Sequence, residues 1–150
     1  MALKIAPDQA LLLDNQLCFA LYSASLAMTK LYKPLLESLG LTYPQYLAML
    51  VLWERDNLSV SGLGRQLCLD SGTLTPLLKR LEVMGLLARV RAVDDERRVQ
   101  VTLTAAGRRL KTKAAKIPGC ILQASQMSLG DILALNTQIR QFRARLEAAA

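Results

Sequence analysis

Apolar residues recur at helical spacing between residues 68 and 85, in the middle of the chain. The apolar stripe consists of Leu74, Leu77, Leu78, Leu81 and Gly85. The opposite side of the same helix carries small and hydroxyl residues followed by two cations: Gly72, Thr73, Pro76, Lys79 and Arg80. Such a helix can press its first turns into a nucleic-acid groove and direct its cations to base edges or phosphates. An ordinary surface helix would show the same pattern, so the neighbouring elements must decide between the two.

Helical periodicity predicts two helices before this stretch. A long amphipathic helix is predicted over 13–39, after a loose arm over 1–10. Pro34 should bend or briefly interrupt this helix, and Gly40 should end it. Thr42 followed by Gln45 is a capping-box pattern, which begins a very apolar second helix reaching about residue 55.

Two caps predict a helix-turn-helix. Ser59 can begin a short third helix to about residue 68, and Asp70 or Ser71 can begin the helix of the leucine stripe. We favour this early start, which places Pro76 inside the helix with a mild distortion. Two short helices joined by a few residues are what a helix-turn-helix requires.

After Gly85 the apolar period changes from 3.6 to 2, which predicts a β-hairpin over 88–92 and 99–103 with a charged tip between. One face of the hairpin is predicted to be apolar and to include Val90 and Val101. The other face is polar and mostly basic, with Arg89, Arg91 and Arg98. The apolar face should pack on the helices, because few isolated hairpins are stable.

Two further helices follow the hairpin. Thr104 can cap a cation-rich helix that Pro118 and Gly119 would break, and Ser128 with Asp131 can cap a last helix ending near residue 147. The predicted fold class is mainly α with a small β-hairpin (α+β), a winged helix-turn-helix. We expect one chain over 1–150, with a DNA-binding region over 42–103. The helices over 10–41 and 104–150 are too apolar to stand alone and should form the dimerisation region of a two-fold dimer.

Charge supports a nucleic-acid partner. The net charge is +7, and residues 65–116 hold twelve Lys/Arg against five Asp/Glu, so the whole excess lies there. This distribution is typical of a contact with a polyanion, although a solvated charged face would also explain it. We expect no membrane contact and a cytoplasmic location, because no apolar run is long enough to span a bilayer and no leader is evident. Metal sites are not expected from three widely spaced cysteines without histidine, and no cofactor is predicted.

The sequence strongly resembles the MarR-type winged-helix repressors, and within them the organic-hydroperoxide sensors called OhrR. The likeness covers nearly the whole chain from residue 13 and is carried by the segments 13–22, 41–46, 69–78 and 94–98. The segment 94–98 (DDERR) is typical of the whole MarR family, whereas the DNQLCF start together with both tyrosines is much more specific.

The resemblance implies the role of each cysteine. Cys18 matches the peroxide-reactive cysteine of the family, and Cys120 matches the resolving cysteine of the two-cysteine subgroup. We hypothesise that an organic hydroperoxide oxidises Cys18 to sulfenic acid, which then forms an intersubunit disulfide with Cys120. Cys120 is predicted in a loop, more accessible than Cys18. Cys68 is expected to be a structural core residue.

The resemblance also implies that Tyr32 and Tyr43 hydrogen-bond the Cys18 thiolate. On one continuous helix Tyr32 would lie about 21 Å from Cys18, because each residue advances the helix by about 1.5 Å. The tyrosines must then come from the partner subunit, which makes the sensor site a property of the homodimer. Without Cys18, ordinary buried packing would be the default interpretation of both tyrosines.

The predicted partner is double-stranded DNA with an inverted-repeat operator. Thr73, Thr75, Pro76, Lys79 and Arg80 are expected near the bases and backbone of the major groove. The resemblance suggests that Arg97 enters the minor groove, braced by Asp95. Arg89, Arg91 and Arg98 are expected to contact phosphates.

Two alternatives stay open. The first is a MarR-type repressor that a small aromatic ligand releases, with Cys18 inert. The second is an enzyme, a thiol peroxidase that uses Cys18 catalytically. The basic hairpin argues against a peroxidase, and so does the lack of a histidine or of an arginine close to Cys18 in the sequence. We therefore expect a regulator and not an enzyme.

Overall fold

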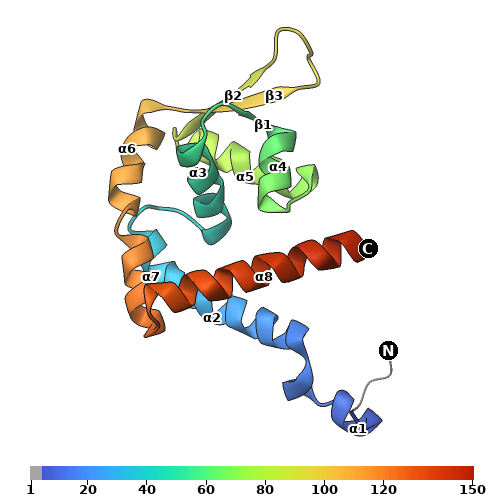
Figure 1. Ribbon diagram of the computed structural model, residues 1–150. Coiled ribbons are helices and arrows are strands. Elements are labelled where there is room, and N and C mark those ends of the chain that lie inside the picture. Colours follow the sequence, from blue (N-terminus) through green and yellow to red (C-terminus); the bar gives the residue numbers. More distant parts are fainter. Residues whose placement is uncertain (1–4) are drawn as a thin grey trace. The chain divides into compact units, whose positions relative to one another are not determined.

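The computed structural model describes residues 5–150 of the chain. The chain divides into two compact units, residues up to 111 and residues 112–150 (Figure 1). The first unit contains α1 (Pro7–Ala10), a 3₁₀ helix η1 (Leu13–Asn15), α2 (Leu17–Glu37), α3 (Tyr43–Glu54), β1 (Leu58–Ser59), α4 (Val60–Leu67), α5 (Ser71–Val83), β2 (Leu87–Arg91) and β3 (Val99–Leu103). Helix α6 (Ala105–Ala114) begins in the first unit, and the second contains α7 (Ile117–Ser125) and α8 (Leu129–Ala149).

The predicted caps position α3, α4 and α5. The Thr42 hydroxyl accepts from the Gln45 N–H, and the Gln45 side chain accepts from the Thr42 N–H at 2.9 Å. Ser59 accepts from Gly62 N at 3.0 Å, and Asp70 accepts from Thr73 N at 2.8 Å. Because these side chains satisfy the first free N–H groups of each helix, the helix starts predicted from the sequence are confirmed.

The leucine stripe of α5 forms the centre of the core of the first unit. Leu74, Leu77, Leu78 and Leu81 are all buried, as predicted. They share this core with residues from α2, α3, α4 and the strands: Leu36, Met49, Leu52, Leu63, Leu87 and Val101. Helix α5 runs through Pro76 without a break, so the early start at Ser71 is confirmed.

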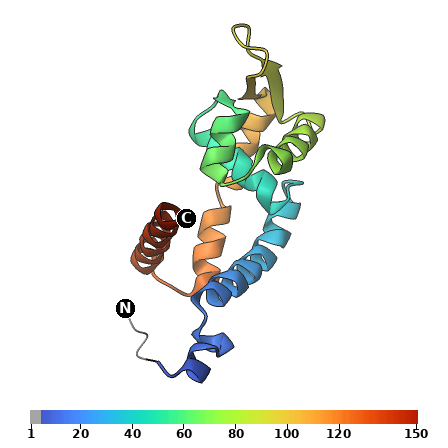
Figure 2. The ribbon, with the colours of Figure 1, turned by 90° about the vertical axis from the view of Figure 1, so that its right-hand side faces the viewer.

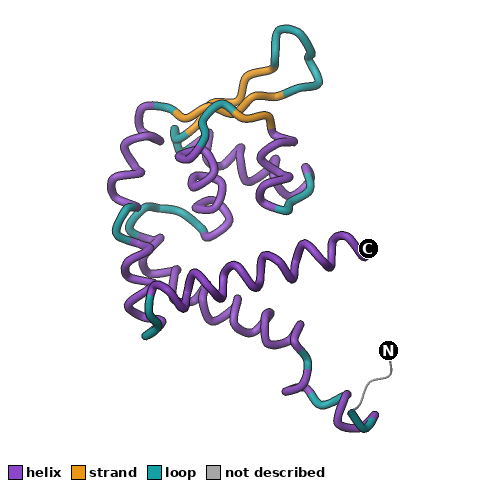
Figure 3. The backbone as a smooth tube through the Cα atoms, viewed as in Figure 1, coloured by secondary structure: helices purple, strands orange, loops and turns teal. Residues whose placement is uncertain are grey.

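The hairpin is confirmed, and a third strand joins it. Strand β3 pairs antiparallel with β2 on one side and with the short β1 on the other, in the order β1-β3-β2. The loop over 92–98 connects β2 to β3 and forms the tip of the wing, which extends beyond the helices α4 and α5 (Figures 2 and 3). Helices α3, α4 and α5 with this wing make the winged helix-turn-helix that the sequence predicted.

The faces of the hairpin were predicted wrongly in β2. Arg89 pairs with the fully buried Val101 and is itself half-buried, whereas Val90 is 59% exposed. Leu87, the first residue of β2, is buried. Because side chains alternate along a strand, the odd-numbered residues of β2 therefore face the core side. The alternation from Ala88 was read correctly as a strand but assigned to the wrong side.

The N-terminal helix also differs from its prediction. Residues 13–15 form a separate 3₁₀ turn, and α2 begins at Leu17. The side chains of Asn15 and Gln16 donate to the carbonyls of Gln9 and Ala10, both at 2.7 Å, and so hold the one-turn helix α1 against η1. The predicted loose arm therefore contains a helical turn over 7–10, and its first four residues lie outside the described part. Helix α2 continues through Pro34 uninterrupted.

In the second unit, Pro118 and Gly119 begin a helix instead of breaking one. Helix α6 ends at Ala114, and α7 starts at Ile117 with Pro118 in its first turn, where a missing N–H costs nothing. Ser128 then caps α8 through the N–H of Asp131 at 3.1 Å, as predicted. In the described residues, none of the helices is long and apolar enough to cross a membrane.

Candidate functional site

Cys18 lies in the first turn of α2, and its side chain is exposed in the chain. Tyr32 is on the same uninterrupted helix, fourteen residues further along. At about 1.5 Å per residue the two positions are separated by about 21 Å along the helix axis. The structure thus confirms that one α-helix carries both residues, and that Tyr32 does not reach the thiol of its own chain.

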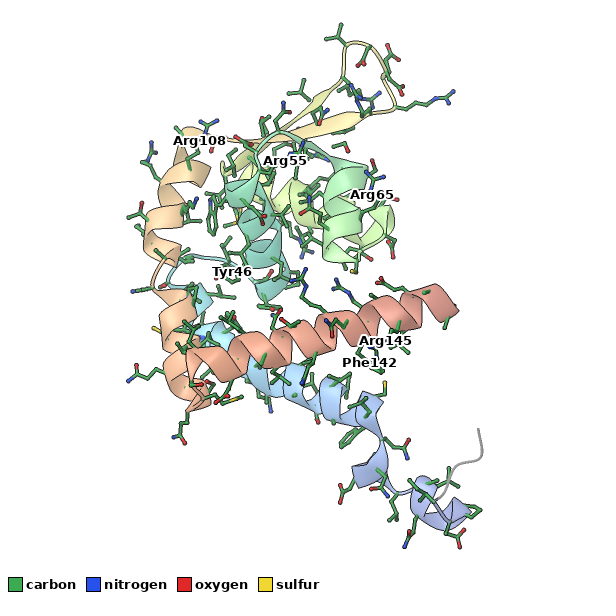
Figure 4. The ribbon with its side chains drawn as sticks, viewed as in Figure 1. Tyr46, Arg55, Arg65, Arg108, Phe142 and Arg145 are labelled. Carbon is green, nitrogen blue, oxygen red and sulfur yellow. The ribbon has the colours of Figure 1, made fainter. Side chains whose placement is uncertain are left out.

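Tyr32 and Tyr43 lie together between α2 and α3. Their ring centroids are 4.9 Å apart, and Tyr46 joins them at 5.9 Å from Tyr32 and 6.5 Å from Tyr43. Tyr46 in turn stacks edge-on against Trp53 (Tyr46 is labelled in Figure 4). Tyr46 was not among the site residues predicted from the sequence, although its position three residues after Tyr43 on one helix is a signal that could have found it.

These phenols keep their protons. Burial, with the neighbouring phenols Tyr43 and Tyr46, raises the pKa of Tyr32 to about 12. Burial also raises the pKa of Tyr43 and of Tyr46 above the ordinary value. All three hydroxyls are therefore neutral near pH 7, and a neutral phenol can donate a hydrogen bond to an anion such as a thiolate.

Cys120 was predicted in a loop, and this prediction is wrong. It lies in the first half of α7 and is only partly exposed, whereas Cys18 is exposed. Cys68 differs too: it is the C-cap of α4, exposed and in the left-handed conformation with φ 56°, and not a core residue. None of the three cysteines is bonded to another within the described chain.

The residues predicted to contact DNA from the helix of the leucine stripe gather on the outer side of α5. Thr73, Pro76, Lys79 and Arg80 are exposed, and Thr75 is half-buried. The Asp70 cap accepts hydrogen bonds from Thr73, and these lower the pKa of the Asp70 carboxyl. The first turn of α5 is therefore fixed while its cations stay in solvent.

The tip of the wing is organised by two acidic residues. Asp95 accepts from the backbone N–H of Arg97 at 3.0 Å, so it holds the main chain of Arg97 and not its guanidinium. Asp94 accepts two hydrogen bonds from one Arg98 nitrogen, each at 3.0 Å. Arg91 and Arg97 are exposed. Asp95 thus stabilises the backbone conformation of the loop at Arg97. The ion pair at the tip of the wing joins Asp94 to Arg98.

Arg89 is held differently from the other wing arginines. Its backbone N–H donates to Glu82 Oε2 at 2.9 Å, and its guanidinium pairs with Glu82 Oε1 at 3.2 Å. These hydrogen bonds from Arg89 are the main cause that lowers the pKa of Glu82. Glu82 is in the last turn of α5, and the sequence alone gave no signal that it pairs with Arg89.

No cluster of three or more His, Cys, Asp or Glu side chains that could hold a metal ion occurs in the described part of the chain.

Comparison with known proteins agrees with this geometry. Residues 30–114, which include the tyrosine cluster, α3, α4, α5 and the wing, match the family model of the transcriptional regulators SarA/Rot. The organic hydroperoxide resistance transcriptional regulator of Bacillus subtilis is 55% identical over 127 residues, which cover 85% of this chain and 86% of the relative. The chain belongs to this family of transcriptional regulators. The resemblance to hydroperoxide regulators seen in the sequence is thereby confirmed.

Solved structures of the family show the same fold in two chemical states. Reduced AbfR bound to DNA matches with a TM-score of 0.78 and 33% identity, over 94% of this chain and 99% of that one. Disulfide-formed AbfR matches with a TM-score of 0.61 and 34% identity, over 90% and 95%. AbfR is a protein of Staphylococcus epidermidis. One relative has therefore been solved both in its reduced form on DNA and with a disulfide.

Proposed function

We propose that this regulator is a DNA-binding repressor that releases an inverted-repeat operator when an organic hydroperoxide oxidises Cys18. The observation that carries the proposal is the placement of Cys18 and Tyr32 on one helix, about 21 Å apart. This placement makes a site that joins the Cys18 thiol to the Tyr32 phenol possible only between two chains. The relative that regulates organic hydroperoxide resistance and the DNA-bound AbfR structure support the same function.

The exposed apolar side chains of two long helices support a homodimer. Helix α2 buries only Leu36, and α8 buries no residue, although both helices are 21 residues long. The large apolar side chains left exposed on them are Leu17, Phe19, Tyr22, Leu26, Met28, Leu31, Leu129, Leu133, Leu135, Ile139 and Leu146. Helices with so much solvated apolar surface need a second surface to be stable, and a second copy of the chain supplies one.

The proposed chemistry balances at sulfur. The Cys18 thiolate attacks the distal oxygen of the hydroperoxide, the O–O bond breaks, and an alcohol leaves as Cys18 becomes a sulfenic acid. The thiol of Cys120 in the partner subunit then attacks this sulfur, water leaves, and a disulfide forms. The neutral phenols of Tyr32 and Tyr43 from the partner donate hydrogen bonds that favour the thiolate before oxidation.

Disulfide formation then couples to DNA release. An S–S bond requires Cα atoms about 4.4–6.8 Å apart, so the two cysteine-bearing helices must approach each other. Half-sites of DNA lie about 34 Å apart per helical turn, and a modest rotation of the two winged units makes one half-site unreachable. In the reduced state Thr73, Thr75, Pro76, Lys79 and Arg80 enter the major groove, and Arg97 enters the minor groove beside it.

A gel shift tests this function. The purified protein is titrated onto A·T-rich inverted-repeat duplexes, with and without an alkyl hydroperoxide, and then after a thiol reductant is added. We expect binding in the reduced state, loss with hydroperoxide and recovery with reductant. Release by a small aromatic ligand without peroxide would contradict the redox mechanism.

Non-reducing electrophoresis tests the role of each cysteine. After hydroperoxide, the wild-type protein should run at the size of a dimer. Cys120→Ser should lose this band while Cys18 is still oxidised, and Cys18→Ser should bind DNA and ignore the hydroperoxide. Because each Cys18 reacts once until it is reduced, the protein should consume about one hydroperoxide per Cys18, whereas a thiol peroxidase supplied with reductant would turn over many times.

A further inference from the structure

One ion pair joins the recognition helix α5 to the wing. The Glu82 carboxylate uses both oxygens on one residue of β2, accepting from the backbone N–H and from the guanidinium of Arg89. Arg89 lies on the inner face of the hairpin opposite the fully buried Val101, and its side chain is only 21% exposed. Its Nε is buried and has no hydrogen-bond partner among the described residues.

A charged residue at this position is costly to the fold. The inner face of β2 is where an apolar side chain would pack, as Leu87 does two residues earlier. Removing a guanidinium from water is unfavourable unless its partner and geometry compensate, and replacing such a pair by apolar residues is often neutral or stabilising. The fold therefore gains little from this pair, and a role in function is the better explanation.

The surroundings of Arg89 indicate that role. Arg89 lines a groove of about 310 Å³ between the start of α5 and the wing. The lining of the groove includes three arginines, Arg89, Arg97 and Arg98, and four serine or threonine hydroxyls. Such a lining fits a phosphate oxygen of a nucleic-acid backbone, since arginines and hydroxyls are its usual ligands.

We propose that Glu82 is a positioning residue for DNA binding, which fixes β2 of the wing to α5 and holds the Arg89 guanidinium at the groove to meet a backbone phosphate. This inference rests on the proposed DNA-binding function. Through the backbone N–H of Arg89, the same carboxylate also sets the position of the wing relative to the recognition helix. Both the sequence-reading helix and the shape-reading wing then engage one stretch of DNA together.

The sign of the effect makes this proposal testable. Glu82→Gln removes a negative charge beside a DNA-binding surface, so simple electrostatics predicts tighter binding to every duplex. If Glu82 instead positions Arg89 and the wing, Glu82→Gln should bind the operator more weakly than the wild-type protein. The amide has a single acceptor oxygen and loses one of the two charge-assisted hydrogen bonds, so operator affinity should fall about tenfold. The slope of log affinity against log salt should also decrease by about one, because Arg89 no longer holds its phosphate.

The experiment measures fluorescence anisotropy on two duplexes of equal length. One is the A·T-rich inverted repeat that the wild-type protein binds best, and the other is a G·C-rich duplex without a repeat. Glu54→Gln is the matched control, because Glu54 is exposed on α3 outside this groove and loses the same charge. We expect Glu82→Gln to weaken both complexes, because the lost phosphate contact does not depend on sequence, and to weaken the operator complex more, because that complex also needs the wing held in position. Glu54→Gln should change neither complex by more than its small charge effect.

A thermodynamic cycle checks the pairing itself. Arg89→Lys keeps the charge but not the paired geometry, and should weaken the operator complex more than the G·C-rich one. In the Glu82→Gln background, Arg89→Lys should reduce operator affinity much less, because the pair between residues 82 and 89 is already weakened. If Glu82→Gln does not fold, as shown by the lack of a cooperative unfolding transition, Glu82→Asp replaces it. This variant keeps the charge on a shorter side chain and should also weaken the operator complex.

Three outcomes would overturn the proposal: tighter binding of both duplexes by Glu82→Gln, equal weakening of both, or additive effects in the cycle. If the wild-type protein binds neither duplex, the proposed function fails and this inference fails with it.

Discussion

At the scale of single residues, several side chains have roles that depend on one contact each. Trp53 donates its indole N–H to the carbonyl of Gly107 at 2.9 Å, and Asp56 accepts from the N–H groups of Asn57 and Leu103. These contacts attach the start of α6 and the base of the wing to α3. The contacts of Trp53 with Gly107 and of Asp56 with Leu103 do not follow from periodicity, because each joins residues about fifty positions apart.

Gly107 provides the sharpest residue-scale prediction for stability. A Cβ at this position would clash with the carbonyl oxygen of Leu86, which is backbone and cannot rotate away. Gly107→Ala should therefore destabilise the fold by about 2–3 kcal/mol. Gly119→Ala is the control, because nothing lies near its added Cβ in α7, and it should be neutral or slightly stabilising. Urea unfolding of both variants measures the difference, and equal stability would contradict the clash.

Tyr32 provides a prediction for pH dependence. Its pKa is raised from 10.0 to about 12 in the folded chain, so the folded state favours the neutral phenol. The resulting stability is complete below pH 10 and is lost as the pH rises toward about 12. The ultraviolet absorbance of tyrosinate should show several late ionisations, and the latest of them should be absent from Tyr32→Phe. An unchanged titration in that variant would contradict the assignment.

At the scale of elements, caps and close approaches fix where each helix begins. Thr42, Ser59, Asp70 and Ser128 all accept from N–H groups of the first turn, and each was identified in the sequence. The start of α7 was not, because Pro118 is compatible both with breaking a helix and with beginning one. Its effect depends on whether the preceding residues leave the helix, which happens here after Ala114.

Asp70 tests the start of the recognition helix. Hydrogen bonds from Thr73 lower the pKa of its carboxyl, so its contribution to stability is present above the ordinary carboxyl range and is lost as the pH falls through the lowered value. Asp70→Asn keeps the cap without a titrating group and should flatten the acid side of the stability curve. Asp70→Ala should lower stability at neutral pH as well. Thermal unfolding across an acid pH series distinguishes the two, and identical curves would contradict the cap.

At the scale of the whole molecule, the proposed homodimer can be tested at the exposed apolar side chains of α2 and α8. Leu133→Lys replaces an apolar residue that is 58% exposed in the chain. If α8 contributes to the dimer, the variant should shift toward the monomer, because a buried lysine charge at the interface is costly. Val93→Lys at the wing tip makes the same chemical change at a fully exposed position and should leave the mass unchanged. Sedimentation measures both, and a dimeric Leu133→Lys would exclude α8 from the interface.

The amino-acid sequence by itself determined the main helices, the hairpin and their order. Periodicity identified the leucine stripe of α5, capping residues identified the starts of α3, α4, α5 and α8, and the change to period 2 identified the hairpin, because each of these signals is local. Cys18, Tyr32 and Tyr43 were identified by resemblance, and the geometric limit on one helix followed from the helical rise alone.

Only the tertiary structure decided what depends on packing between distant segments. It placed Arg89 on the inner face of the hairpin, because burial of Leu87 and Val101 sets which side of β2 faces the core. It brought Tyr46 into the tyrosine cluster and joined Glu82 to Arg89. It also placed Cys120 on a helix. Local patterns give the period of a segment but not the surface on which it packs, and that surface decides which side chains meet.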